Sequence, residues 1–271
     1  MSYEYRGKTA LITGASGGLG EVFARQLAAR GMNLILVARS EAKLRGLAEE
    51  LARTHSVKAD AIASDLSKPG AGAALHAATK AKGLAVDLLI NNAGFGSFGR
   101  FETIDPKQES EMVQVNIATP LELCHAYIPD MLARGGGTVV NVASTAGFQP
   151  MPYFSTYAAT KAFLLSFSDA LWAEYRKRGV HVLAVCPGPT RTGFFDATKS
   201  DVIEKVGLFQ NLMMSSDKVV AQSLRALERR KHYVVTGWIN WIAAHSSRFG
   251  PRWLVALVTS LMTRPPVQKP A

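Results

Sequence analysis

The chain has 271 residues and 48% hydrophobic content, enough for one large domain with a sizeable core or at most two small ones. Its two cysteines exclude a disulfide framework, and no Cys/His spacing suits zinc, so we expect buried thiols in a reducing compartment and no metal site. The net charge is +10, but nine Lys/Arg and only one acid fall within residues 218–271, so the basicity belongs to the C-terminal segment.

The N-terminus lacks the apolar core of a secretory signal, and no run reaches the ~18 apolar residues that span a bilayer. These features predict a cytoplasmic protein.

The first expected element is a short buried strand at residues 8–13, followed by a glycine-rich turn and a helical pattern. The turn reads Thr13-Gly14-Ala15-Ser16-Gly17-Gly18-Leu19-Gly20. Gly14 allows a tight turn, Gly18 lets a phosphate approach the backbone, and Gly20 lets the helix pack closely on the sheet. The amides at the helix start then face an anion. A plain loop is the alternative, but the strand–turn–helix context favours dinucleotide binding by Gly14, Ser16, Gly18, Leu19 and Gly20.

A second strand at residues 33–38 ends at Arg39. In a dinucleotide fold this position faces the adenosine ribose, where an acid favours NAD and a cation suits a 2′-phosphate. Arg39 therefore predicts NADP(H), although it could also be an ordinary surface arginine.

After a helix near residues 40–54, a third strand at 57–63 leads to Asp65 and Leu66. Asp65 is either a helix cap or a contact to the adenine amino group, and it can be both. A helix near 67–82 and a fourth strand at 86–90 follow, ending in Asn91-Asn92-Ala93-Gly94. The small residues leave room for a cofactor, and the asparagines can bond backbone or ribose.

Helical segments near residues 105–133 contain Asn116 in apolar surroundings. A buried amide needs partners, so its role is structural, catalytic or both.

A strand at residues 137–143 delivers Ser144 at its carboxyl end, and the helix that follows carries Tyr157 and Lys161. Because they are four residues apart, the two side chains lie on one helix face. We expect the ammonium to lower the tyrosine pKa from its usual value of about 10 and to poise it as a general acid/base. Ser144 could hydrogen-bond the oxygen on which the tyrosine acts. Taken alone, the spacing also fits a solvated helix face.

A sixth strand at residues 180–185 stops at a Pro/Gly turn that aims polar groups at its carboxyl end, Cys186-Pro187-Gly188-Pro189-Thr190-Arg191-Thr192. Residues 193–215 are rich in Phe, Leu and Met, and a long apolar insertion usually covers something. We expect a lid over a hydrophobic substrate. A helix near 216–230 and a strand at 233–235 close the pattern.

Strands and helices alternate about six times with short connections, which predicts an α/β fold: a Rossmann-like, doubly wound parallel sheet flanked by helices. The motifs above all follow strands, and ligands bind at the carboxyl ends of such strands.

On these motifs, the sequence resembles the short-chain dehydrogenase/reductase family, in its short single-domain branch, over about residues 7–236. The shared features are Thr-Gly-x-x-x-Gly-x-Gly at 13–20, Asn-Asn-Ala-Gly at 91–94, Asn116, Ser144, Tyr157-x-x-x-Lys161, and Pro-Gly at 187–188 with Thr192. Arg39 is similar to the NADP-preferring members, whereas Thr190 departs from the aliphatic residue more usual there. The resemblance implies about seven strands and a homodimer or homotetramer.

The resemblance also implies roles. Tyr157 would protonate the substrate carbonyl, Lys161 would lower its pKa and bond the nicotinamide ribose, Ser144 would hold the carbonyl, and Asn116 would keep a water for a proton relay. Besides Tyr157 and Lys161, the resemblance implies three groups of cofactor contacts. Asp65 and Leu66 would lie at the adenine, and Asn91, Asn92, Ala93 and Gly94 along the cofactor. Pro187, Gly188, Thr190 and Thr192 would lie at the nicotinamide carboxamide.

We therefore predict an NADP(H)-dependent oxidoreductase that transfers hydride between nicotinamide and a hydrophobic carbonyl/alcohol substrate. The alternative is a non-catalytic dinucleotide-sensing protein, or a membrane-attached interaction protein, on the same fold.

Past residue 236 the resemblance thins, so we divide the chain into a catalytic domain, 1–236, and a basic, apolar helical extension, 237–271. Its apolar stretch 253–262 is too short to span a membrane. The extension could pack on its own subunit or an oligomer partner, or lie on a membrane surface. Nucleic-acid binding is not expected, because no nucleic-acid module is visible.

Overall fold

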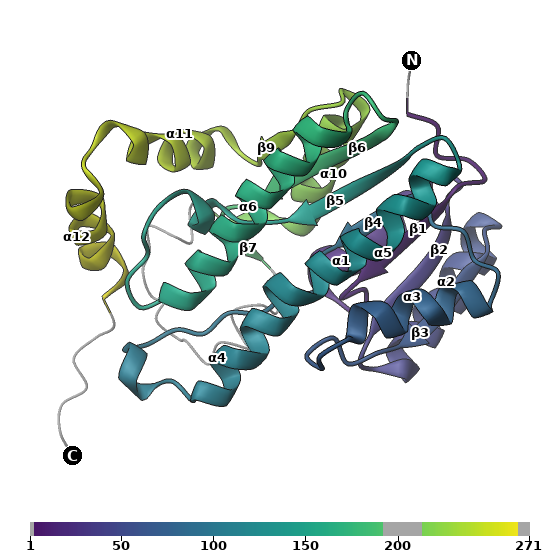
Figure 1. Cartoon of the computed structure of the whole chain (residues 1–271), viewed down its shortest axis with the longest axis horizontal. Coiled ribbons are helices and arrows are strands. Elements are labelled where there is room, and N and C mark those ends of the chain that lie inside the picture. Colours follow the sequence, from purple (N-terminus) through teal and green to yellow (C-terminus); the bar gives the residue numbers. More distant parts are fainter. Residues whose placement is uncertain (1–2, 192–212, 265–271) are drawn as a thin grey trace.

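A computed structural model describes residues 3–191 and 213–264. A seven-stranded parallel sheet forms its centre, in the order β3-β2-β1-β4-β5-β6-β9 (Figure 1). The strands are β1 (Thr9–Thr13), β2 (Asn33–Ala38), β3 (Ala59–Ala63), β4 (Leu88–Asn91), β5 (Gly137–Val142), β6 (Val180–Cys186) and β9 (Tyr233–Val235). The predicted fold class is confirmed.

Strand β1 pairs with β2 on one side and with β4 on the other, with Ala10 opposite Leu34 and Leu88. The chain therefore builds outward from β1 in one direction, then returns to build in the other. At such a switch, the connections leave the strand ends in opposite directions and open a crevice at the carboxyl edge.

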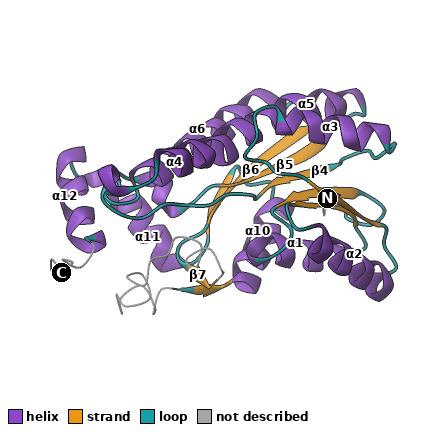
Figure 2. Ribbon diagram, turned by 90° about the horizontal axis from the view of Figure 1, so that it is seen from below, coloured by secondary structure: helices purple, strands orange, loops and turns teal. Residues whose placement is uncertain are grey.

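Helices cover both faces of the sheet, as Figure 2 shows from its edge. One layer holds α1 (Gly18–Ala28), α2 (Glu41–His55) and α10 (Ser216–Glu228), and the other holds α3 (Ala71–Ala81), α5 (Thr119–Ala133) and α6 (Ser155–Tyr175). Successive strand residues point to opposite faces, so Ile12 packs in the core with Phe23 of α1, and Leu11 in the core with Leu123 of α5. Burial on both faces explains why the strands read as continuous apolar runs.

The predicted helical region 105–133 is continuous but not uniform. It consists of α4 (Pro106–Val113), a π-helical turn (Gln114–Ala118) and α5. The carboxylate of Asp105 caps α4 by accepting from the Lys107 amide at 2.9 Å. The π-helical turn contains Asn116, and such turns often occur at functional sites.

Several of the other described elements are short. They are three 3₁₀ turns, Phe101–Thr103, Thr145–Phe148 and Ser247–Phe249, and the paired strands β7 (Thr190–Arg191) and β8 (Met214–Ser215). Of the predicted apolar lid, residues 193–212 lie outside the described residues.

Two helices follow β9, α11 (Trp238–Ser246) and α12 (Arg252–Thr263), and they lie at one end of the molecule beyond the sheet (Figure 1). The 3₁₀ turn between them and helix α12 are held to the segment that precedes α6. Ser247 donates to the Phe148 carbonyl at 3.2 Å, Thr259 to Pro150 at 2.9 Å and Thr263 to Pro152 at 3.0 Å. The extension thus packs on its own subunit. Among the described residues, no helix is long and apolar enough to cross a bilayer.

Candidate active site

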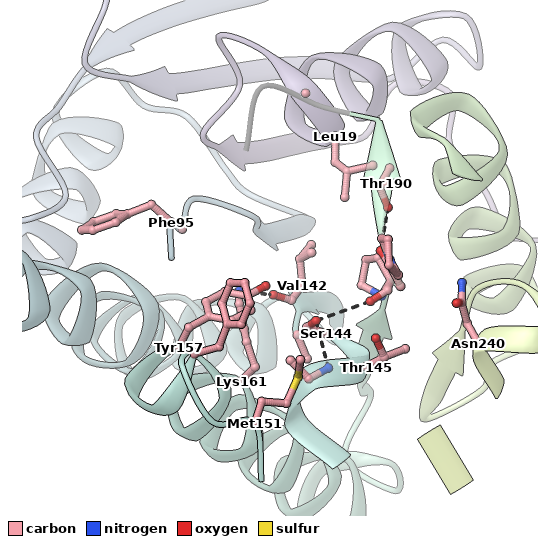
Figure 3. Close-up of a pocket in the computed structure, with 18 of the residues that line it drawn as sticks. Leu19, Phe95, Val142, Ser144, Thr145, Met151, Tyr157, Lys161, Thr190 and Asn240 are labelled. Carbon is pink, nitrogen blue, oxygen red and sulfur yellow. Dashed lines mark hydrogen bonds between the residues drawn. The ribbon is translucent and has the colours of Figure 1, made fainter. Parts of the chain in front are cut away.

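A cavity of about 620 Å³ lies at the carboxyl edge of the sheet (Figure 3). This is a usual size for a small-molecule site. Its walls come from the glycine-rich turn, the loop after β4, the end of β5, α6, the turn after β6, and both C-terminal helices. The structure therefore joins most predicted motifs in one space: Gly14, Ser16, Gly18, Leu19, Arg39, Asn92, Ala93, Gly94, Ser144, Tyr157, Lys161, Pro187, Gly188 and Thr190.

The glycine-rich turn needs its glycines for two reasons. Gly14 and Gly18 have φ values of +67° and +56°, which disfavour residues with a Cβ. Gly20 has no such strain, but a Cβ there would overlap the carbonyl oxygen of Gly14. Gly20 therefore permits the close helix–sheet approach predicted for it and does not itself line the cavity.

Thr13 links the glycine-rich turn to the loop after β4. Its hydroxyl accepts from the backbone amides of Asn92 and Ala93, each at 3.0 Å, and the Asn92 side chain donates to the Thr13 carbonyl at 2.8 Å. The two loops are thereby fixed across the crevice. Sequence reasoning quoted Thr13 only as part of the motif, although a hydroxyl at a strand end before a glycine turn could have indicated this role.

Arg39 directly follows β2, is exposed, and lies on the cavity wall.

Three predicted cofactor residues are bonded within the protein and do not line the cavity. Asp65 accepts from the Ser67 amide at 3.1 Å and from its hydroxyl at 2.8 Å, and these bonds lower its pKa. They lie in a turn before α3, whose N-cap is Gly70, so Asp65 is not the helix cap that the sequence offered as one alternative. Leu66 is buried, and its carbonyl accepts from Thr119 at 2.9 Å. Asn91 is buried and donates to Asn141 at 2.8 Å. Thr192 lies outside the described residues.

Ser144 ends the extended chain after β5 and begins a 3₁₀ turn. Its hydroxyl accepts from the Ala146 amide at 3.1 Å and donates to the Pro187 carbonyl at 3.5 Å (Figure 3). These bonds, with a side-chain hydrogen bond to Tyr157, fix Ser144 between the tyrosine and the turn after β6.

Tyr157 and Lys161 lie on one face of α6 and both reach the cavity (Figure 3). The Lys161 ammonium donates to the Val142 carbonyl at 2.8 Å and lies 5.8 Å from the centre of the tyrosine ring. Its residue is only 5% exposed. The pair is therefore a buried site and not a solvated helix face.

The predicted lowering of the Tyr157 pKa is wrong for this structure. Burial raises the pKa of Tyr157 to about 12, and the hydrogen bond with Ser144 offsets this only in part. Burial also lowers the pKa of Lys161, to about 8. The physical reason is that desolvation disfavours both charged forms, and the ammonium is directed at a backbone carbonyl.

Asn116 is 1% exposed and clamps the loop after β4 to α6. Its amide nitrogen donates to the Phe95 carbonyl and to the Thr160 hydroxyl, both at 3.0 Å, and its oxygen accepts from the Phe95 amide at 3.2 Å. A Cβ on Gly94 would lie 2.9 Å from that oxygen and 3.4 Å from Lys161 Nζ. Asn116 thus has the structural role that the sequence left open, next to the lysine.

The cavity has an apolar end that sequence reasoning missed. Besides Phe95, it is lined by Phe98, Met151, Phe154 and Met262, and the C-terminal helices add Asn240, Ala243, Ala244, Thr259 and Thr263. Asn240 packs so closely on Gly188 that a Cβ there would overlap it. Its position as a polar residue between tryptophans and isoleucines was the available signal.

A family model described as short chain dehydrogenase matches residues 8–202. The hydroxysteroid dehydrogenase-like protein 1 of Gallus gallus is 36% identical over 185 residues, which span 67% of this chain and 55% of that protein. The very-long-chain 3-oxoacyl-CoA reductase-A of Danio rerio is 32% identical over 248 residues, 88% of this chain and 74% of that protein. The inactive hydroxysteroid dehydrogenase-like protein 1 of Homo sapiens is 30% identical over 264 residues, 95% and 77% of the two chains.

Solved structures agree over nearly the whole chain. A 7β-hydroxysteroid dehydrogenase matches with a TM-score of 0.84 and 28% identity, covering 96% of this chain and 100% of that one. A short-chain dehydrogenase from Sphingobium yanoikuyae, solved with NADPH, matches with a TM-score of 0.79 and 31% identity, covering 97% and 98%.

Proposed function

The chain belongs to the short-chain dehydrogenase/reductase family, and from that premise we propose that it is an NADP(H)-dependent oxidoreductase that acts on a hydrophobic carbonyl/alcohol pair. This proposal rests on one observation: the glycine-rich turn, Arg39, Ser144, Tyr157 and Lys161 all line the same cavity.

The residues present fit a dinucleotide phosphate. The backbone at Gly17 is open, with nothing within 4 Å of where a Cβ would lie, and Gly18 and Leu19 at the amino end of α1 line the cavity, where a helix start suits an anion. Arg39 supplies a cation beyond β2, which suits a 2′-phosphate. The bound NADPH of the Sphingobium yanoikuyae relative supports the same choice.

The bound cofactor supplies or accepts the hydride, and the protein supplies position and a proton. In reduction, Tyr157 donates its hydroxyl proton to the substrate oxygen, which Ser144 holds through a second hydrogen bond. A tyrosine with a pKa of about 12 keeps its proton at neutral pH, so the proton that reduction requires is present on its hydroxyl. We propose that Lys161 stabilises the anion left on the tyrosine, which its place 5.8 Å from the centre of the tyrosine ring supports.

Asn116 positions this machinery. We propose that it holds the loop after β4 against α6 and keeps a water near Lys161 for proton return. Its bonds to Phe95 and Thr160 support the first role.

The substrate is proposed to be lipophilic, because the end of the cavity beyond Tyr157 is lined by Phe98, Met151, Phe154 and Met262. The hydroxysteroid and long-chain acyl names of the relatives support ring or chain ketones. On this view, residues 1–236 form the catalytic domain and residues 237–271 a C-terminal extension, of which α11 and α12 close the substrate end. A homodimer or homotetramer is the assembly we propose from family membership.

The test is NADPH oxidation, followed by absorbance, against a panel of lipophilic ketones and aldehydes, with NADH in parallel. Tyr157→Phe should abolish turnover while NADPH still binds. Tyr175→Phe, at the far end of the same helix, is the matched control and should remain active. Full turnover by Tyr157→Phe would overturn the proposed chemistry.

The second candidate is a protein that binds the dinucleotide without chemistry, which the human relative's name, inactive, brings into consideration. Tight NADPH binding, no turnover on any member of the panel, and an unchanged cellular effect of Tyr157→Phe would favour this candidate.

A further inference from the structure

The large exposed apolar side chains are concentrated in one part of the molecule. Of the fourteen in the described residues, eleven lie between residues 238 and 262. Scattered exposed apolar residues are ordinary, but a concentration of this kind marks an interaction surface.

Helix α12 is amphipathic in the reverse sense from a normal surface helix. Its buried residues are Thr259 and Thr263, whose hydroxyls bond the carbonyls of Pro150 and Pro152. Its outward residues are Leu254, Leu257, Val258 and Leu261, which follow the i, i+3, i+4, i+7 spacing of one helix face and are 42–77% exposed. The polar side of the helix thus faces the protein, and the apolar side faces away.

Helix α11 repeats this arrangement. Asn240 and Ala244 are buried, whereas Trp238, Ile239, Trp241 and Ile242 are exposed, Trp238 by 73%. Between the helices, Phe249 is 92% exposed. We call these outward residues, together with those of α12 and Trp253, the extension face.

Within residues 237–264, the charged residues of the extension are all arginines. Arg248, Arg252 and Arg264 are exposed and form none of the ion pairs among the described residues. No acid occurs in the sequence after Glu228. A partner for this surface must therefore be apolar in part and anionic in part.

We propose that the extension face docks on the surface of a membrane rich in anionic lipid. Tryptophans, a leucine face and flanking arginines are the composition of a helix that lies in the headgroup region with its apolar side in the acyl boundary. A second copy of the chain fits less well, because an isologous contact would bring the same three arginines together and the extension carries no acid to oppose them.

The same helices form part of the cavity wall. Met262, Thr259 and Thr263 of α12 and Asn240 of α11 line it, and Met262 is also 46% exposed. The docked surface therefore adjoins the apolar end of the cavity, where a lipid-dissolved molecule would enter without crossing water.

The test is co-sedimentation of the full chain with vesicles of phosphatidylcholine alone and of phosphatidylcholine with phosphatidylglycerol. We expect binding to the anionic vesicles that weakens in high salt. Leu257→Gln/Leu261→Gln, and separately Arg252→Gln/Arg264→Gln, should each reduce the partition coefficient roughly tenfold or more. NADPH binding serves as the folding check, since these side chains lie outside the nucleotide motifs.

Matched controls change the same chemistry elsewhere. Lys58→Gln/Lys177→Gln removes two exposed cations next to the amino ends of β3 and β6, and Phe101→Gln/Val113→Gln removes two exposed apolar residues. Both controls should bind vesicles as the unaltered chain does.

No binding to anionic vesicles, or equal losses in the controls, would overturn the proposal. The proposal would also be overturned if the Leu257→Gln/Leu261→Gln variant bound vesicles normally and only its oligomeric state changed, because a second copy of the chain would then cover the extension face. Because the readout is lipid binding, it is independent of the proposed oxidoreductase activity.

Discussion

At the scale of single residues, burial of the Lys161 ammonium costs the folded protein electrostatic free energy. The ordinary lysine pKa of 10.5 applies to the unfolded chain, whereas burial lowers the pKa of Lys161 to about 8 in the folded protein. Between these values the unfolded state binds more protons, so stability rises with pH across the window. The contribution is limited to about 1.4 kcal/mol per pH unit.

Lys161→Met should therefore flatten the increase in unfolding free energy between pH 8 and about 10, measured by urea denaturation of the nucleotide-free protein. Lys58→Met, which removes an exposed lysine, should keep the increase. Identical pH profiles for the Lys161 variant and the unaltered chain would contradict the burial argument.

Arg39 is tested by nucleotide preference. Arg39→Asp should weaken NADPH binding by about 1.5–3 kcal/mol, because a charge-assisted contact to the 2′-phosphate is lost, and should leave NADH binding little changed. Isothermal titration with both nucleotides checks this, with Arg53→Asp, farther along α2, as the control. An unaltered NADPH/NADH ratio would refute the role of Arg39.

Sequence alone placed Ser144, Tyr157 and Lys161 in one site, because a strand end and an i, i+4 helix spacing determine where side chains meet. It could not give the sign of the tyrosine pKa change, since that depends on how much water and which carbonyl surround the ammonium. Nor could it separate Asn91, which bonds Asn141, from Asn92, which faces the cavity. Neighbours along a strand end point to opposite sides, and only the strand's exact end decides which points inward.

At the scale of elements, the junction of β1 and α1 depends on the absence of one methyl group. Gly20→Ala should destabilise the protein by about 1–3 kcal/mol, because the new Cβ overlaps the Gly14 carbonyl and one backbone segment must shift. Gly17→Ala is the matched control: its backbone is extended and its surroundings are open, so its stability should change little. Chemical denaturation without nucleotide measures both, and equal stabilities would contradict the packing argument.

The alternation of strands and helices could be predicted from the sequence, because each buried strand is an apolar run that ends at a glycine or polar turn. The π-helical turn at Gln114–Ala118 could not be predicted, because one extra residue in a turn leaves the apolar pattern of the sequence almost unchanged. The sequence also did not predict which sides of α11 and α12 would contact the rest of the protein. Their apolar residues suggested a packed face, yet threonines and small residues make the contacts with the protein.

At the scale of the whole molecule, the two ends of the cavity belong to different parts of the chain. A chain ending at Gly237 should still bind NADPH, because the glycine-rich turn and Arg39 follow β1 and β2, and β4, β5 and β6 separate these strands from β9, after which the extension begins. It should show a raised KM for a lipophilic ketone that the full chain reduces, since Thr259, Met262 and Asn240 no longer form the wall. Titration and steady-state kinetics measure the two properties, and an unchanged KM would show that the extension does not shape the substrate site.

The reversed amphipathicity of α12 has a consequence for how such a protein can diverge. Because threonine hydroxyls and backbone carbonyls attach the helix, the leucines on its outer side add little to folding stability. Those positions can mutate with little effect on the fold or on the chemistry at Tyr157. Selection can therefore retarget the outer face from one surface to another while the enzyme beneath it is conserved.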